Sequence, residues 1–382
     1  MNRRQFLTAL SSLGGLGSLG LLSACTPAEI KRGVTTSQSL VKGDVPKVLS
    51  AQIPKTGIAE IDGLIQSQLK QLIKELSKTW GDKKVATPKE YVKYTDHYQS
   101  RAIINFSTRT IQVETLAAQN ATSTLKSAIV ATLLTSEDPS TVDLLSDKAV
   151  EIGQKPFLSG LVLDQDNKSI ETQWRAERYA DLLLRSMKND TYNGKSRHFV
   201  LFNMVKDTQA KQEHKYAITV QRQSQRFGIQ KSLIYAIIQT ESDFNPYAMS
   251  PIPAYGLMQI VPQSAGRDAH ELLYNKAGTP TKNTLFNAEK NIEFGTAYLH
   301  ILFNRYLVKV KNSVAREYCC IAAYNTGSGN VLKAFDSDRT QALKKINNMN
   351  SQEVYNHLRK HLKYEEARNY LRKVVKNKKN FG

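Results

Sequence analysis

An apolar run followed a few residues later by Asn245-Pro246 is the feature that most constrains this chain. Five apolar residues within six positions predict a largely buried helix: Leu233, Ile234, Ala236, Ile237 and Ile238. Asn245-Pro246 prevents further helix, because a proline disfavours helical backbone in the residue before it. Glu241 therefore lies near the carboxyl end of a buried helix.

Two local effects oppose ionisation of the Glu241 side chain. Burial beside apolar surface disfavours the charged carboxylate, and the negative end of the helix dipole acts in the same direction. A carboxyl group that stays protonated near neutral pH can give a proton to the leaving oxygen of a glycosidic bond. Taken alone, a glutamate at a helix end is more often a solvated residue, so this interpretation needs support from other motifs.

Four motifs supply that support, in a fixed order between residues 241 and 327. They are Glu241-Ser242-x-Phe-Asn245-Pro246, Gly256-Leu257-Met258-Gln259, Asn291-Ile292-x-x-Gly295 and Ala323-Tyr324-Asn325-x-Gly327. Together they resemble the catalytic domain of the soluble lytic transglycosylases, which has a lysozyme-like fold, and the resemblance runs from about residue 215 to residue 382. It implies an enzyme that cleaves the β-1,4 bond between MurNAc and GlcNAc of murein without water and leaves 1,6-anhydro-MurNAc ends.

The resemblance also assigns roles to individual residues. Glu241 matches the single catalytic acid and base of the family, and Ser250 and Gln259 match residues that line the sugar-binding cleft. Tyr324 matches a tyrosine near the acid and the scissile sugar. Further candidates for the cleft are Ser242, Asn325 and Tyr370. No metal ion and no cofactor is implied.

Each of these polar residues has an ordinary structural alternative. Ser250 can cap a turn, Gln259 can satisfy buried backbone groups, and Tyr324 can belong to the core. Asn245 and Asn325 are better explained as turn formers that shape the cleft.

The single carboxylate of the motifs favours a reaction without water. Most glycosidases need two carboxylates. One group acting twice is sufficient when the C6 hydroxyl of the same MurNAc attacks C1, because a held nucleophile has a large effective molarity. Two alternatives stay open: a hydrolytic lysozyme on the same fold, and a murein-binding scaffold without turnover.

The first residues predict export and a lipid anchor. Arg3 and Arg4 precede an apolar stretch that ends in Leu22-Ser23-Ala24-Cys25, which indicates a signal peptide over residues 1–24 and a lipidated Cys25. Thr26 stands where an aspartate would favour the inner membrane, so we expect an outer-membrane lipoprotein that faces the periplasm. The arginine pair also resembles a twin-arginine signal, and the export route stays open.

The rest of the chain divides into a tether and two domains. Residues 25–46 are polar and predict a tether, and residues 47–200 predict an α+β domain of unknown role. Within that domain we expect helices at 58–80, 121–134 and 174–187 and a hairpin at 101–116. Residues 201–382 predict a mainly α, lysozyme-like catalytic domain, in which Cys319 and Cys320 fill the core as small hydrophobes.

The charge fits an anionic polymer as partner. The whole chain carries a net charge of +19, and residues 201–382 hold 27 Lys and Arg against 14 Asp and Glu. An exported lipoprotein is in a different compartment from the chromosome. The expected partner is therefore murein, whose peptides carry carboxylates, and not nucleic acid. His357 and His361 lie four residues apart, but no third ligand stands nearby, so we expect no metal site. Cell-wall enzyme partners stay unassigned.

Overall fold

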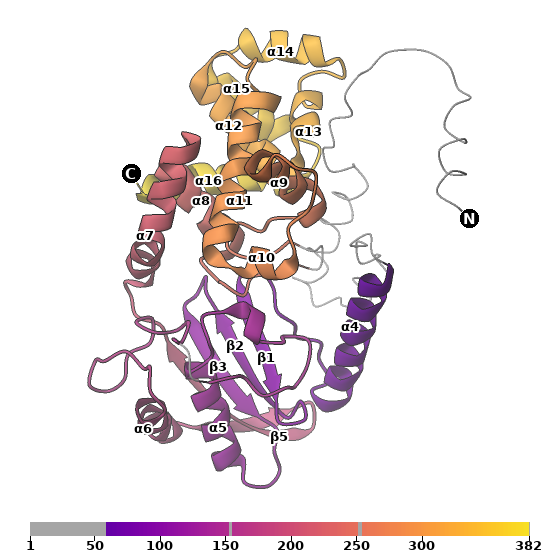
Figure 1. Cartoon of the computed structure of the whole chain (residues 1–382). Helices are drawn as coiled ribbons and strands as arrows, with labels where there is room; N and C mark the ends of the chain where they lie inside the picture. The colour runs from indigo at the N-terminus through magenta and orange to yellow at the C-terminus, as the bar shows by residue number, and fades with distance from the viewer. Residues whose placement is uncertain (1–58, 153–154, 251–253, 382) are drawn as a thin grey trace.

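The computed structural model describes residues 59–152, 155–250 and 254–381, and Figure 1 shows them as a sheet-containing part beneath a helical part. The predicted signal peptide, Cys25 and the tether at 25–46 lie outside the described residues. Among the helices of the described ranges, none combines the length and the apolar character needed to cross a membrane.

The first part, which we call the sheet domain, is α+β. Its five strands pair antiparallel in the order β1-β2-β3-β5-β4. The expected hairpin and all three expected helices are present. The elements in chain order are α4 (Ala59–Thr79), β1 (Glu90–Thr95), β2 (Ser100–Asn105), β3 (Thr110–Thr115), α5 (Ala121–Leu133), η1 (Pro139–Thr141), α6 (Gln173–Leu184), β4 (Lys188–Tyr192) and β5 (Lys195–Asn203).

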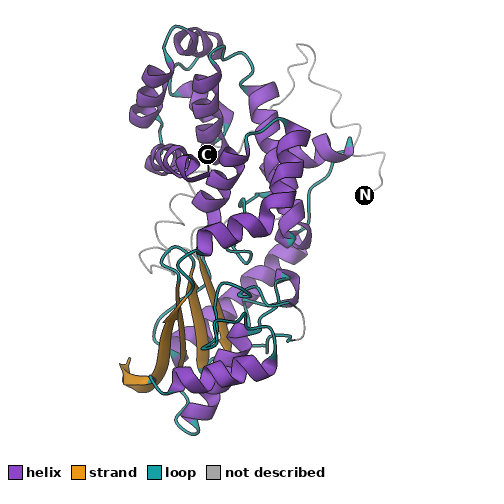
Figure 2. Cartoon of the chain, turned by 90° about the vertical axis from the view of Figure 1, so that its left-hand side faces the viewer, coloured by secondary structure: helices purple, strands orange, loops and turns teal. Residues whose placement is uncertain are grey.

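Alternation along the central strands places the apolar residues on one face of this sheet. Ile104 of β2 and Ile111 and Val113 of β3 are fully buried, and they belong to one core with Leu125 and Ile129 of α5. Figure 2 shows helices on this side of the sheet. The hydrophobic core of the sheet domain therefore lies between the sheet and α5 with α6.

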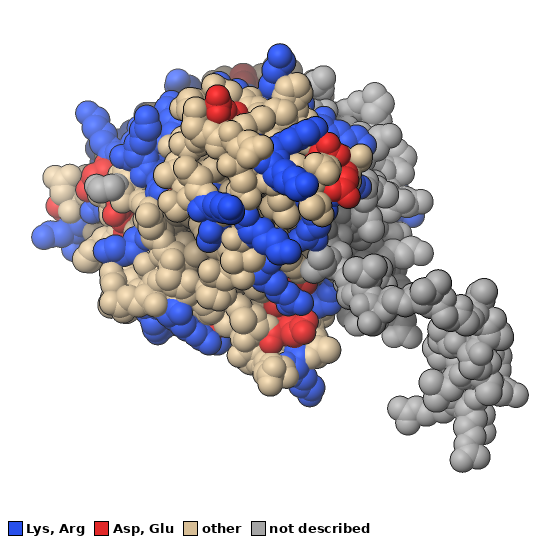
Figure 3. Space-filling view, turned by 90° about the horizontal axis from the view of Figure 1, so that it is seen from above, with Lys and Arg blue, Asp and Glu red and all other residues tan. Residues whose placement is uncertain are grey.

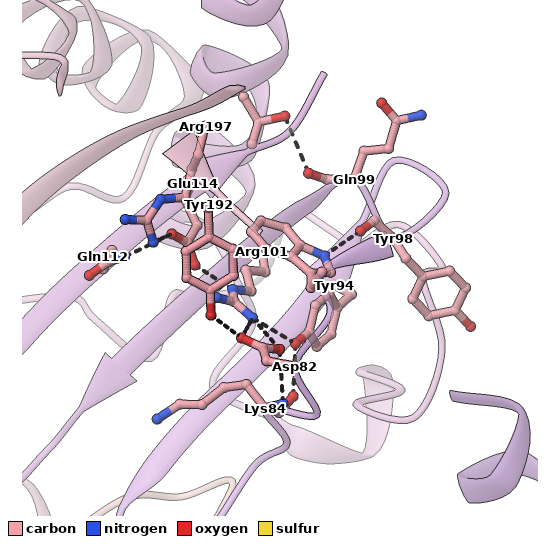
Figure 4. A network of polar contacts seen from close by, with 12 residues as sticks. Asp82, Lys84, Tyr94, Tyr98, Gln99, Arg101, Gln112, Glu114, Tyr192 and Arg197 are labelled. Atoms are coloured by element: carbon pink, nitrogen blue, oxygen red, sulfur yellow. Dashed lines mark hydrogen bonds and ion pairs between the residues drawn. The ribbon is translucent and has the colours of Figure 1, made fainter. Parts of the chain in front are cut away.

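The opposite face carries a buried network of charges at the end of α4. Arg101 is 3% exposed, donates to Asp82 at 2.8 Å and pairs with Glu114, which also accepts from Arg197 at 2.9 Å. The Arg101 guanidinium lies 3.9 Å from the centre of the Trp80 ring. Figure 4 shows the side chains of Asp82, Arg101, Glu114 and Arg197 pointing toward one another from separate elements. The network ties the segment after α4 to the sheet.

The second part, which we call the helical domain, surrounds the predicted buried helix, α8. Its core includes Cys319 and Cys320, both fully buried as expected. The elements are α7 (Thr208–Phe227), α8 (Lys231–Ser242), η2 (Pro262–Gly266), α9 (Arg267–Tyr274), α10 (Lys282–Phe286), α11 (Ala288–Ile301), η3 (Leu302–Tyr306), α12 (Ser313–Thr326), α13 (Ser328–Lys333), α14 (Arg339–Asn347), α15 (Ser351–His361), α16 (Glu365–Lys378) and η4 (Lys379–Phe381).

The chain passes from one domain to the other between β5 and α7. Strand β5 runs to Asn203 and α7 begins at Thr208, so the passage lies a few residues beyond the expected boundary at 200–201. The domains are also joined away from this passage. Tyr247 of the helical domain is 1% exposed and belongs to the core of the sheet domain, where its hydroxyl donates to the Ser136 carbonyl.

Candidate active site

Glu241 lies in the last turn of α8, as the sequence predicts. The five apolar residues that marked this helix are at most 1% exposed. The helix ends because Asp243 adopts a left-handed backbone conformation with φ 48°, and its N–H donates to the Gln239 carbonyl at 3.1 Å. Phe244 follows with φ 65°, so the chain turns sharply away. The turn leaves the Glu241 side chain beside α16, which packs along α8.

The surroundings of Glu241 favour its neutral form. Burial raises the pKa of this carboxyl from 4.5 to about 8, the nearby Tyr370 hydroxyl partly offsets the rise, and the neighbouring Glu366 adds to it. Lys89 and Lys373 oppose the rise. These surroundings favour a protonated Glu241 near neutral pH, with burial as the main cause.

The Gly256–Gln259 motif forms the loop beside Glu241. The Ser242 hydroxyl, which is fully buried, donates to the Leu257 carbonyl at 2.8 Å and thus fixes this loop to the end of α8. Asn291 of α11 holds the same loop, because its side chain accepts from the Met258 N–H at 2.7 Å and donates to the Tyr255 carbonyl at 2.7 Å. Ser242, a candidate for the cleft, therefore supports the loop from behind.

Gly256 has a conformation that explains its place in the motif. Its φ is +73°, and a Cβ atom there would lie 2.4 Å from the Asn291 amide nitrogen and 2.4 Å from the Leu285 carbonyl oxygen. Glycine lets the loop approach α11 closely enough for the Asn291 hydrogen bonds. Asn291, from the third motif, thus holds the Gly256–Gln259 loop of the second motif in place.

The two polar atoms of the Gln259 side chain differ in their hydrogen bonding. Its Nε2 donates to the carbonyls of Ala248 and Gly256 at 3.1 and 2.9 Å, which is the structural alternative named for this residue. Its Oε1 is buried and has no hydrogen-bond partner among the described residues. Buried polar atoms are usually paired, so this oxygen is available to a ligand.

Tyr324 of α12 and Tyr370 of α16 both lie near Glu241. Tyr324 donates to the Met258 carbonyl at 2.9 Å, and its ring lies 5.7 Å from that of Tyr298. The buried Tyr370 hydroxyl makes no hydrogen bond that meets ordinary geometry within the described part of the chain. Burial and the proximity of Glu241 raise the pKa of both phenols, so both stay protonated.

Ser250 and Asn325 complete the predicted set. Ser250 donates its backbone N–H to the Ala254 carbonyl at 3.1 Å, and the proline-rich residues between them lie outside the described ranges. The Asn325 side chain bonds to Glu366. The structure places Tyr324 and Tyr370 near Glu241 and bonds Asn325 to Glu366. Gln259 belongs to the loop that Ser242 and Tyr324 hold, and Ser250 stands at the edge of the loop that follows α8.

Three ionisable neighbours of Glu241 have no role assigned from the sequence: Glu366, Lys373 and Lys89. Glu366 belongs to the segment Glu366-Ala-Arg-Asn-Tyr370 near the end of the chain, which is part of the family resemblance, and burial raises its pKa. Lys89 comes from the sheet domain, more than a hundred residues earlier in the chain, and no local pattern marks it.

Comparison with known proteins gives two family matches that together cover most of the described chain. Residues 58–215 match the family described as membrane-bound lytic murein transglycosylase C, N-terminal domain, and residues 218–347 match the transglycosylase SLT domain. Membrane-bound lytic murein transglycosylase C from Yersinia pestis (strain Pestoides F) is 43% identical over 315 residues, which are 81% of this chain and 88% of that protein. The protein of the same name from Yersinia pseudotuberculosis serotype O:1b gives the same values.

The chain belongs to the membrane-bound lytic murein transglycosylase C family. Membership confirms the predicted family, the α+β domain followed by a mainly α, lysozyme-like catalytic domain, and the assignment as a lyase that degrades murein. Six of the predicted site residues fall inside the SLT match: Glu241, Ser242, Ser250, Gln259, Tyr324 and Asn325. Tyr370 and Glu366 lie beyond its end.

Two solved structures are similar to part of this chain. An inactive mutant of lytic transglycosylase Slt from Pseudomonas aeruginosa has 23% identity and a TM-score of 0.32, over 44% of this chain and 24% of that one. The 70 kDa soluble lytic transglycosylase from Escherichia coli has 25% identity and a TM-score of 0.33, over 43% of this chain and 23% of that one. At these TM-scores, the family assignment depends on the sequence matches.

Proposed function

We propose that this lytic transglycosylase of the membrane-bound C family cleaves the β-1,4 bond between MurNAc and GlcNAc with Glu241 as its acid and base. The observation that carries the proposal is a carboxyl group whose pKa is raised to about 8 by burial, in a site where the buried Gln259 Oε1 has no hydrogen-bond partner among the described residues. A neutral acid and open hydrogen-bonding positions are what a sugar substrate requires.

In the first step, Glu241 gives its proton to the oxygen that joins the two sugars. The bond from that oxygen to C1 of MurNAc breaks, and GlcNAc leaves with a new hydroxyl. Positive charge develops at C1, and the 2-acetamido group of the substrate stabilises it. Glu241 is now a carboxylate in a site that disfavours the charge, which prepares it to take back a proton.

In the second step, the C6 hydroxyl of the same MurNAc attacks C1 and gives its proton to Glu241. The product is a 1,6-anhydro sugar, and the enzyme returns to its starting state. No water enters, so atoms balance without a second catalytic carboxylate. Holding the ring so that its own C6 hydroxyl lies near C1 supplies the effective concentration.

The neighbours of Glu241 receive binding and positioning roles. The Oε1 of Gln259 is assigned to amide groups of the sugar, and the Tyr370 hydroxyl to positioning the Glu241 carboxyl. Tyr324 fixes the loop that carries Gln259 through the Met258 carbonyl and presents its ring beside the acid. Ser250 is assigned to sugar binding on the family resemblance.

Murein glycan strands fit the surface of the helical domain. Figure 3 shows the end of the molecule that carries α14 in Figure 1, where Lys and Arg side chains spread over the visible face and Asp and Glu side chains are fewer. Peptide carboxylates of murein complement such a surface.

The anchor follows from the first residues of the chain. A lipid on Cys25 and a tether over residues 25–46 hold the sheet domain and the helical domain at the outer membrane, facing the periplasm. This arrangement keeps the enzyme beside its polymeric substrate.

Digestion of purified murein with the chain and with Glu241→Gln, followed by mass spectrometry of the products, tests the proposal. We expect 1,6-anhydro ends from the wild type and no products from the variant. Reducing ends, one water heavier, would identify the hydrolytic alternative instead. A variant as active as the wild type would remove Glu241 from the mechanism, and an inactive wild type that still binds murein would favour the scaffold.

A further inference from the structure

Lys89 of the sheet domain reaches the last turn of the helix that carries Glu241. Its ammonium group donates to the Gln239 carbonyl at 3.2 Å and pairs with the Asp243 carboxylate at 2.7 Å. The Ser107 hydroxyl, from the β2–β3 turn, donates to the same carboxylate. Two loops of the sheet domain thus hold residues two positions before and two positions after Glu241.

The next residues of the helical domain are held by the sheet domain as well. Asn245 is fully buried and donates its side-chain amide to the Pro88 carbonyl at 3.1 Å. The Tyr247 ring lies 5.1 Å from the rings of both Tyr91 and Phe157. The segment that leaves the candidate active site is therefore anchored at successive points in the other domain.

Helix ends need such partners. The last carbonyls of a helix have no intrahelical donor, and a cation there stabilises both the carbonyls and the helix dipole. Asp243 and Phe244 have left-handed backbones with φ of 48° and 65°, which non-glycine residues adopt only when their surroundings hold them. Lys89 is the group that both neutralises Asp243 and bonds the helix end.

We propose that Lys89 is a positioning residue for proton transfer by Glu241, so that docking of the sheet domain completes the active site of the helical domain. The proposal rests on the proposed role of Glu241. It gives the sheet domain a function in catalysis, because a displacement of the acid by a fraction of an ångström misaligns it with the bridging oxygen.

Lys89 also belongs to the set of charged and titratable groups that face Glu241. The set comprises Tyr324 of α12, Glu366, Tyr370 and Lys373 of α16, and Lys89. Within this set, Lys89 alone comes from the sheet domain. Its positive charge lowers the pKa of Glu241, so its removal raises that pKa further. Loss of Lys89 therefore changes both the position and the titration of the acid.

The test uses kcat, KM and the pH dependence of kcat for murein cleavage by full-length protein. Lys89→Met removes the charge and the hydrogen bonds, and Lys89→Arg keeps both. Lys215→Met is the matched control, because Lys215 forms a different ion pair between the two domains, with Glu137 at 3.2 Å. Glu241→Gln is measured in parallel.

We expect Lys89→Met to lower kcat about tenfold with KM nearly unchanged and to move the alkaline limb of the profile to higher pH. Lys89→Arg should recover most of the loss, and Lys215→Met should match the wild type.

Wild-type kcat and pH profile in Lys89→Met would overturn the proposal. Equal losses in Lys89→Met and Lys215→Met would also overturn it, because they would indicate domain docking in general. These results are distinguishable from failure of the proposed function, which would appear as full activity of Glu241→Gln.

Discussion

Glutamine in place of Glu241 is expected to stabilise the folded protein, by an amount that grows with pH. The carboxyl has a pKa of about 8 when folded and 4.5 when unfolded, so the folded state binds more protons between these values. The free energy of unfolding therefore falls as the pH rises from 4.5 to about 8. The full shift corresponds to about 5 kcal/mol, and partial solvation of the ion reduces this to about 2 kcal/mol.

Glutamine has nearly the same shape and no charge, so Glu241→Gln lacks this pH-dependent loss. Urea unfolding of the wild type and the variant at about pH 5 and about pH 9 measures it. The free energy of unfolding of the variant, relative to that of the wild type, should be about 2 kcal/mol larger at the higher pH than at the lower. Glu365→Gln, at an exposed glutamate of α16, is the control and should show no such gain. A stability difference that is the same at both pH values would refute the reasoning.

Three further predictions follow from the contacts. The kcat for murein cleavage should stay constant up to about pH 8 and fall about tenfold per pH unit above it. A fall in kcat centred near pH 4.5 would contradict a catalytic acid with a raised pKa. Arg101→Met should destabilise the sheet domain by about 3 kcal/mol in urea unfolding, because it removes a partner of the fully buried Glu114; a change under about 1 kcal/mol would show the network to be dispensable. Gly256→Ala should lower the melting temperature and the activity together, because the new Cβ collides with Asn291; an unchanged melting temperature would exclude that collision.

Local patterns were sufficient for the element that matters most. The apolar run and Asn245-Pro246 predict α8, its burial and its end beside Glu241, because both signals lie in neighbouring residues of the chain. The hairpin at 101–116 is predicted for the same reason, since its strands alternate and its turn residues separate them. Strand β4 escapes prediction, because its residues are polar and mostly exposed and it is held through pairing with β5.

The parts of the site that the sequence could not give depend on contacts between distant segments. Lys89 contacts α8 from the other domain. The Tyr247 ring packs in the core of the sheet domain, and no local pattern in the sequence of the helical domain indicates this contact. Ser242 shows the opposite case. Its place beside Glu241 suggested a residue of the cleft, but helical geometry turns its hydroxyl inward to the Leu257 carbonyl.

Digestion of murein in water enriched in oxygen-18 tests the central claim most directly, because it asks whether solvent enters the product. If neutral Glu241 protonates the bridge and then accepts the C6 proton, every new MurNAc end is a 1,6-anhydro sugar without label, and Glu241→Gln releases none. Labelled reducing ends from the wild type would contradict the account.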